Sequence, residues 1–192
     1  MPVTVTTAPT EEPLSRADLK DHLRLTNDDD DEDGYLEGLI VMARRAIEVQ
    51  TRRSIITQTL QLTLDGFPRG RVIKLPRPPV ASVTSVKYDD TAGTEQTLST
   101  DYYQADTYST PGRVVLKDGY SWPSTINNAN SVRIVYVAGY GAATDVPEDL
   151  IQAIKFLAAH WYANREPVAT GPGSFTAVPQ TFDFLAGPYR VY

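Results

Sequence analysis

Apolar residues recur every three or four positions in several stretches of the chain, which is the spacing of one face of an α-helix. The strongest pattern predicts a helix over residues 34–53, with an apolar face formed by Leu36, Leu39, Ile40, Ala43, Ala46 and Ile47. A shorter helix at about 15–26 is predicted to begin at Ser15, which with Asp18 approximates a capping box. A third helix, at about 147–165, opens with Pro147 and ends before Pro167. The two long helices are expected to pack together.

Between these long helices the period of the apolar residues changes to two, which is typical of β-strands. Residues 54–138 are therefore predicted to form a β-rich insertion of short strands, with turns at Asp65-Gly66 and around residues 89–93. The predicted fold class is α+β: a small helical bundle with a β-rich insertion between its two long helices. The domain formed by these helices and the β-rich insertion is expected to span residues 14–165.

The two ends of the chain show neither period and are predicted to be arms. Residues 1–13 contain three prolines and several threonines, and we expect a flexible N-terminal extension. Residues 166–192 contain four prolines and three glycines, which disfavour a continuous helix or a central strand. The same segment carries more apolar and aromatic residues than a solvated linker. It is predicted to be an extended C-terminal arm that binds a partner surface, or alternatively a strap folded back over its own domain.

Composition narrows the function classes. The chain has 24 acidic and 18 basic residues, a net charge of −6, which argues against a surface that grips nucleic acid through its phosphates. It has no cysteine, which excludes disulfides, thiolate metal sites and cysteine nucleophiles. No signal-peptide pattern opens the sequence, and no apolar run approaches the length of a membrane span. We expect a soluble intracellular protein.

Candidate chemistry is sparse. Asp29, Asp31, Asp33 and Gly34 match positions of a calcium-binding EF-hand loop, but the position of its bidentate glutamate is Ile40. The only histidines, His22 and His160, each stand alone on a predicted helix. We therefore predict no catalytic residue, no metal site and no cofactor. The eleven tyrosines and two tryptophans are of types enriched at protein interfaces, although core packing is expected to take about half of the clustered ones.

Several short segments, in a fixed order, resemble one protein family. They are the long-helix residues Ala43 through Glu48 with Thr51, Arg53 and Gln58; Leu75-Pro76 with Pro79-Val80; Pro111-Gly112-Arg113-Val114; Trp122-Pro123; Val137-Ala138-Gly139-Tyr140-Gly141; Pro147-Glu148-Asp149-Leu150; and Ala158-Ala159-His160-Trp161-Tyr162 with Arg165. Together they resemble the head-tail connector, or adaptor, proteins of tailed bacteriophages and of related gene transfer agents. The helix, β-insertion, helix layout agrees with this family.

The resemblance implies a structural role in the virion neck, after assembly in the host cytoplasm. Such proteins form a ring, here expected to be a dodecamer, beneath the portal protein, and they offer a platform to a stopper or tail-terminator protein. DNA passes through the ring without specific binding, and no membrane is involved. The C-terminal arm is the element implied to reach the portal, with candidate contact residues Phe175, Phe182, Phe184, Leu185, Tyr189, Arg190 and Tyr192.

A second function, from another class, stays open at this point. The β-rich block is also compatible with a binding module of a phage tail or a similar assembly. Such a module would recognise carbohydrate or protein through exposed aromatic residues such as Tyr103, Tyr120 and Trp122.

Overall fold

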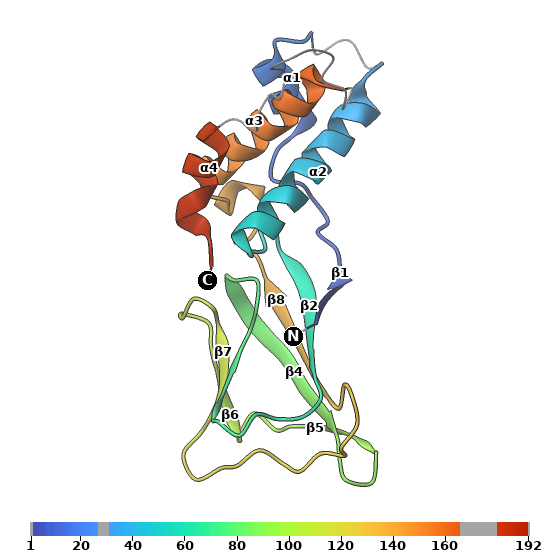
Figure 1. Ribbon diagram of the computed structural model, residues 1–192, viewed down its shortest axis with the longest axis vertical. Coiled ribbons are helices and arrows are strands. Elements are labelled where there is room, and N and C mark those ends of the chain that lie inside the picture. Colours follow the sequence, from blue (N-terminus) through green and yellow to red (C-terminus); the bar gives the residue numbers. More distant parts are fainter. Residues whose placement is uncertain (1, 27–30, 166–179, 192) are drawn as a thin grey trace, which may run out of the picture. The chain divides into compact units, whose positions relative to one another are not determined.

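The computed structural model describes residues 2–26, 31–165 and 180–191 (Figure 1). The chain divides into two compact units. The β unit comprises Met1–Pro9 and Thr57–Tyr140, and the helical unit comprises Thr10–Ile56 and Gly141–Tyr192. The α+β class and the β-rich insertion between two long helices are confirmed.

The β unit contains two antiparallel sheets. One has the strand order β1-β2-β8-β4-β5, and the other has the order β3-β7-β6. The strands are β1 (Val3–Thr7), β2 (Gln58–Leu64), β3 (Val72–Lys74), β4 (Val80–Asp89), β5 (Glu95–Thr97), β6 (Tyr103–Asp106), β7 (Arg113–Leu116) and β8 (Val132–Ala138). Strand β8, from the end of the unit, lies between β2 and β4, so the middle of the sheet is formed by strands that are distant in sequence.

The core of the β unit follows from the alternation of apolar residues. In β8, Val132, Ile134 and Tyr136 are buried, and in the register of the sheet Leu62 and Leu60 of β2 lie opposite the last two. The second sheet adds Ile73, Tyr103 and Val114 to the same cluster. The Tyr136 hydroxyl donates a hydrogen bond of 2.7 Å to the Pro76 carbonyl, which satisfies the one polar group this ring brings into the core.

The helical unit contains α1 (Arg16–Leu23), α2 (Asp33–Thr51), α3 (Glu148–Ala163) and α4 (Gln180–Ala186), with 3₁₀ turns η1 (Ala143–Asp145) and η2 (Gly187–Tyr189). Ser15 caps α1 as predicted, because its hydroxyl accepts from the Asp18 amide at 3.1 Å. Helices α1, α2 and α3 pack around buried residues that include Leu19, Leu36, Ile40, Ala43, Ile47, Leu150, Ile154 and Leu157. None of the helices in the described residues is long and apolar enough to cross a membrane.

A buried ion pair fixes the path of the chain into this unit. Arg44, only 4% exposed, donates to both carboxylate oxygens of Glu12 at 2.6 and 3.0 Å and to Glu48 at 3.0 Å. Glu48 in turn accepts from the Ile55 amide at 2.9 Å. The carboxylates of Glu12 and Glu48 raise the pKa of Arg44 despite its burial. The segment before α1 is thereby tied to α2.

Two expectations about the ends of the chain are wrong. Residues 1–13 were expected to be flexible, but Val3–Thr7 is an edge strand that pairs with β2, because alternating valine and threonine favour a strand and the prolines flank it. The C-terminal arm was expected to be extended, but it contains α4, which forms where neither proline nor glycine interrupts residues 180–186. Residues 166–179 of the arm and 27–30 of the acidic run lie outside the described residues.

Candidate functional site

The C-terminal segment, defined here as residues 180–191, is the candidate interaction site, and it lies against its own helical unit. Helix α4 packs on α3 and also touches α2 (Figure 1). Phe182 is 6% exposed and Ala186 is fully buried, so one face of α4 is an apolar contact. For residues 180–191 the structure therefore corresponds to the strap alternative.

Polar contacts fix the same segment to the C-terminal end of α2. The Val191 amide donates to the Thr51 carbonyl at 3.0 Å, and Arg53 Nε donates to the Tyr189 carbonyl at 2.5 Å. A carbonyl in the last turn of a helix has no partner within the helix, so the contact to Val191 satisfies Thr51. Nearer the start of the segment, Gln50 Nε2 donates to Asp183 Oδ1 at 2.5 Å.

The predicted site residues separate into different environments. Phe182 is buried against the helical unit, whereas Phe184 is 80% exposed. Leu185 and Tyr189 are half-buried, and the Tyr189 hydroxyl donates to Asp149 at 3.2 Å. The exposed Arg190 forms an ion pair of 3.2 Å with Asp183. Phe175 and Tyr192 lie outside the described residues.

A second cluster stands where the chain leaves α3 toward the arm. The Arg165 guanidinium lies 4.6 Å from the ring centre of Tyr35 and 4.8 Å from that of Tyr162, close enough for cation–π contacts. Arg165 also pairs with Glu32, and the Tyr162 hydroxyl donates to the same carboxylate at 2.5 Å. These hydrogen bonds lower the pKa of Glu32, and they raise the pKa values of Tyr162 and Arg165. The cluster holds the last described residue before the arm.

Sequence reasoning did not identify this cluster. The participating residues are about 130 positions apart along the chain. The available signal was one aromatic residue in each long helix, Tyr35 near the start of α2 and Tyr162 near the end of α3. Acidic residues precede Tyr35 in the sequence, and Arg165 follows Tyr162. That signal becomes informative only when the helices are known to be antiparallel neighbours.

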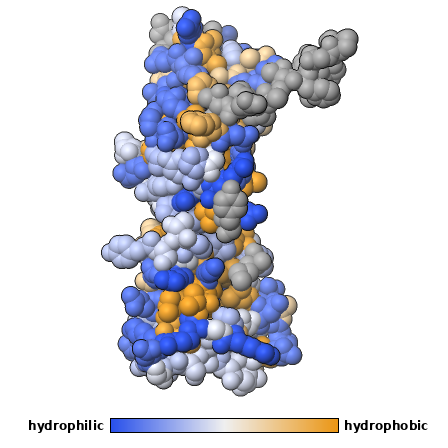
Figure 2. Space-filling model, turned by 60° about the vertical axis from the view of Figure 1, so that its left-hand side comes forward, coloured by the Kyte–Doolittle hydropathy of each residue, from blue (hydrophilic) through white to orange (hydrophobic). Residues whose placement is uncertain are grey.

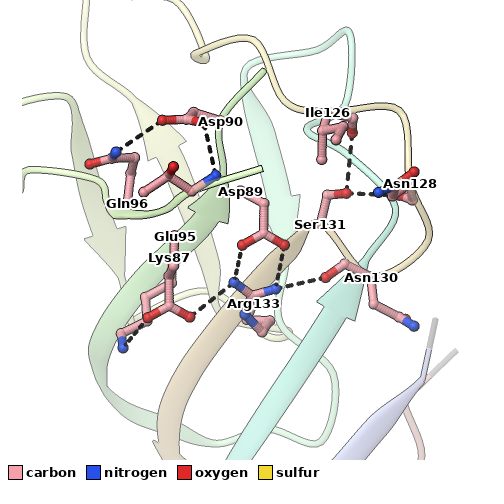
Figure 3. A network of polar contacts seen from close by, with 11 residues as sticks. Lys87, Asp89, Asp90, Glu95, Gln96, Ile126, Asn128, Asn130, Ser131 and Arg133 are labelled. Carbon is pink, nitrogen blue, oxygen red and sulfur yellow. Dashed lines mark hydrogen bonds and ion pairs between the residues drawn. The ribbon is translucent and has the colours of Figure 1, made fainter. Parts of the chain in front are cut away.

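Carboxylates in the β4–β5 hairpin are used to hold the turn. Figure 3 shows the Arg133 guanidinium between Asp89, at 2.6 and 3.0 Å, and Glu95, at 3.0 Å. Lys87 reaches the other oxygen of Glu95 at 2.8 Å. The hydrogen bond from Arg133 lowers the pKa of Asp89, and those from Lys87 and Arg133 lower the pKa of Glu95. Asp90 accepts from the amides of Ala92 and Thr94, which closes the turn. These carboxylates therefore stabilise the hairpin through hydrogen bonds and ion pairs.

The aromatic residues considered for ligand recognition are also largely engaged. Tyr103 is 6% exposed in the core. Trp122 stacks on Phe67 with ring centres 4.8 Å apart, and its indole nitrogen donates to the Gly70 carbonyl at 2.8 Å. Tyr120 is 44% exposed, and its ring centre lies 4.7 Å from that of Tyr102. These three aromatic side chains therefore do not form a row of exposed rings on which a sugar could stack.

The histidines do not form a site. His22 packs edge-on against Phe156, with ring centres 5.7 Å apart, and burial lowers its pKa. The backbone carbonyl of His160 accepts from Asn164 at the end of α3. Within the described ranges, no group of three or more His, Asp or Glu residues could hold a metal ion.

Comparison with known proteins gives a consistent result. The family model of the head completion protein (HCP) matches residues 13–172. A chain from the neck of an empty gene transfer agent (GTA) particle, computed with C6 symmetry, is 30% identical, with a TM-score of 0.82. The match covers 100% of this chain and 96% of that one. No curated protein sequence matches the chain.

Two further solved structures give the same result, each over 100% of this chain and 96% of the other. A chain of the virion of the native gene transfer agent particle is 28% identical, with a TM-score of 0.82. A chain from the neck of the native particle, computed with C12 symmetry, is 27% identical, with a TM-score of 0.76.

Proposed function

This chain belongs to the head completion protein family, and we propose that it is the head-tail connector, or adaptor, of a tailed phage or phage-like particle. One observation carries the proposal: the whole chain matches a neck chain at 30% identity and a TM-score of 0.82. The proposed role is structural, as expected for a chain of the virion neck. A carbohydrate-binding module is not favoured, since Tyr103 and Trp122 are engaged internally.

The proposed assembly is a ring of twelve subunits in the neck of the virion, formed in the host cytoplasm. The similar neck structures were computed with C6 and with C12 symmetry, and a ring of twelve satisfies both. The ring surrounds the channel through which DNA leaves the capsid. A net charge of −6 supports a wall along which DNA slides without adhering.

The C-terminal segment is the proposed portal contact. Burial of Phe182 and Ala186 holds α4 on the helical unit, and this placement directs Phe184 to solvent with 80% of its surface exposed. A large exposed aromatic residue on a fixed element is the kind of anchor that dominates protein interfaces. A stopper or tail-terminator protein is the proposed partner on the opposite side of the ring.

Portal binding by full-length variants tests the proposal. With the portal protein of the same particle, the wild-type chain is expected to form rings on the portal in negative-stain images. Phe184→Ala is expected to weaken portal binding by about 2 kcal/mol, or about 30-fold in Kd, as for an interface anchor. A chain truncated after residue 179 is expected to lose portal binding.

Tyr108→Ala is the matched control, because Tyr108 is 99% exposed but belongs to the β unit. Its affinity for the portal should equal that of the wild type. Equal losses from both substitutions would argue against the C-terminal segment as the contact. Tailed, infectious or gene-transferring particles made without this chain would contradict the connector function itself.

A further inference from the structure

Helix α2 carries an apolar stripe that its own unit covers only at one end, where Arg165 and Tyr162 lie against Tyr35. Tyr35, Met42 and Val49 are 39%, 55% and 73% exposed and follow one another at intervals of seven residues. Residues seven apart lie nearly in line along an α-helix. The stripe is about 21 Å long, at about 1.5 Å of rise per residue. The opposite face of α2, with Leu36, Leu39, Ile40, Ala43 and Ile47, is the one buried against α1 and α3.

Gly38 is exposed beside this line, rotated about 60° around the helix axis from Tyr35 and about 40° from Met42. Glycine destabilises a helix interior relative to alanine. A Cβ at this position would meet no atom within 4 Å, so packing inside the helical unit does not explain why this residue is a glycine. A glycine here leaves the α2 backbone open to close approach by a second molecule.

Single exposed apolar residues are ordinary on a soluble protein. Figure 2 shows one face of the molecule on which apolar patches are separated by hydrophilic residues. Such scattered exposure needs no explanation. The stripe on α2 differs because its members repeat every seven residues and so lie along one side of the helix, about 10 Å apart.

Charge indicates which partner covers the stripe. Arg45 and Arg52 are exposed beside it, and among the described residues neither forms an ion pair. The helical unit as a whole carries 17 acidic and 10 basic residues, a net charge of −7, whereas the β unit carries 7 acidic and 8 basic residues. The stripe is thus an apolar line with a cationic border on an otherwise acidic unit. A second copy of the same acidic unit is complementary to it.

We propose that the α2 stripe of Tyr35, Met42 and Val49, with Gly38 beside it and bordered by Arg45 and Arg52, docks on the acidic helical unit of a second copy of this chain. The inference rests on the proposed ring. A cyclic ring joins two different, complementary surfaces of each copy head to tail, and an apolar surface with a cationic border is complementary to an acidic one. The contact to the portal is a separate surface, centred on Phe184.

A cysteine-based experiment tests the occupant directly, because the wild-type chain has no cysteine. The full chain with Val49→Cys is purified as free protein, and particles are purified from cells that produce it. The thiol is labelled with a photoreactive benzophenone maleimide on the free chain, before its assembly into particles, and separately on the assembled particles. The labelling rate is expected to fall by about tenfold in particles, since thiol reactivity follows exposure. Label placed before assembly is expected to cross-link two copies of this chain on illumination.

Glu37→Cys is the matched control on the same helix. Its side chain is 61% exposed but lies away from the stripe. It should stay reactive in particles and give few products of two chains. As a second variant, Val49→Asp should fold normally by circular dichroism, because Val49 is exposed, and should yield mostly heads without tails.

Several results would overturn the inference. These are a Val49→Cys product with a different protein, a product within one chain, or unchanged reactivity in particles that contain the chain. If purified particles lack the chain altogether, the connector function fails and this inference fails with it. Particles that contain the chain but show no protection at residue 49 reject the stripe while leaving the connector function intact.

Discussion

The backbone amide of Val191 donates a hydrogen bond to the carbonyl of Thr51, 3.0 Å away. Thr51 is the last residue of α2, so the end of the chain completes the hydrogen bonding of the helix that carries the proposed ring contact. Docking of the C-terminal segment and the geometry of α2 are therefore linked through one helix end. Disturbing the segment should be detectable at Thr51.

Phe182→Ala is expected to release the C-terminal segment from the helical unit. Truncating a buried phenylalanine costs about 3–5 kcal/mol, but for a terminal segment the loss is limited by the free energy of its local opening. Hydrogen exchange of the Val191 amide should become much faster, with little change in the unfolding midpoint of the whole chain. Phe184→Ala, at an 80% exposed position, should leave that exchange unchanged. Equal acceleration in both variants would contradict the observed packing of α4.

Arg44→Met is expected to destabilise the helical unit by about 3–5 kcal/mol, because removing one partner leaves the carboxylates of Glu12 and Glu48 without their cation. Urea unfolding followed by circular dichroism measures the loss. Arg45→Met is the matched control: the neighbouring cation is exposed, and its replacement should change stability by less than about 0.5 kcal/mol. Comparable midpoints for the two variants would show that the buried pair contributes little.

The sequence predicted the elements that are determined by residues close together in the chain. The period of Leu36 to Ile47 predicted α2, and the pairing of Ser15 with Asp18 predicted the start of α1. Strand β1 was missed because its partner, β2, begins more than fifty residues later, and a short run of valine and threonine does not reveal that pairing. The strand order was likewise inaccessible, since β8 enters between β2 and β4 from a distant part of the chain.

The candidate site shows a similar division. Residue type predicted that the end of the chain would be a contact segment, and Phe182 and Phe184 were both named as portal contacts. Residues two apart on a helix lie on nearly opposite faces. Once α4 forms, Phe182 therefore turns into the helical unit and Phe184 turns to solvent. In an extended segment, which the prolines led us to expect, residues two apart point to the same side. Phe182 and Phe184 would then not have been separated.

Gly112→Ala is expected to destabilise the β unit by about 1–3 kcal/mol, because overpacking a close contact forces neighbouring groups to shift. A Cβ at residue 112 would lie 2.7 Å from Val80 Cγ2 and 2.8 Å from Val80 Cβ. Thermal unfolding measures the change. In Gly70→Ala the new methyl group meets nothing within 4 Å, so its midpoint should match the wild type. A neutral Gly112→Ala would mean that β4 can move away at no cost.

Asp106 is expected to make stability depend on pH in the acid range. Its carboxylate accepts from the Ser109 hydroxyl and from Arg113 Nε, both at 2.7 Å, and these hydrogen bonds lower its pKa from 3.8 to about 2. Because the pKa is lower in the folded chain, the carboxylate contributes stability above its unfolded pKa of about 4. That contribution is lost as the pH falls from about 4 to about 2. Asp106→Asn lacks this titration, so it should be less stable than the wild type at neutral pH and approach it near pH 2.

Two measurements check this pH dependence. Thermal unfolding of the wild type and Asp106→Asn across the acid range gives the closing gap, and an NMR titration gives the pKa of the Asp106 carboxyl itself. Ser109→Ala removes the largest cause of the shift, so it should move that pKa back toward its usual value. A carboxyl that titrates near pH 4 in the folded wild type would contradict the hydrogen bonds to Ser109 and Arg113. It would leave the turn before β7 without its proposed electrostatic support.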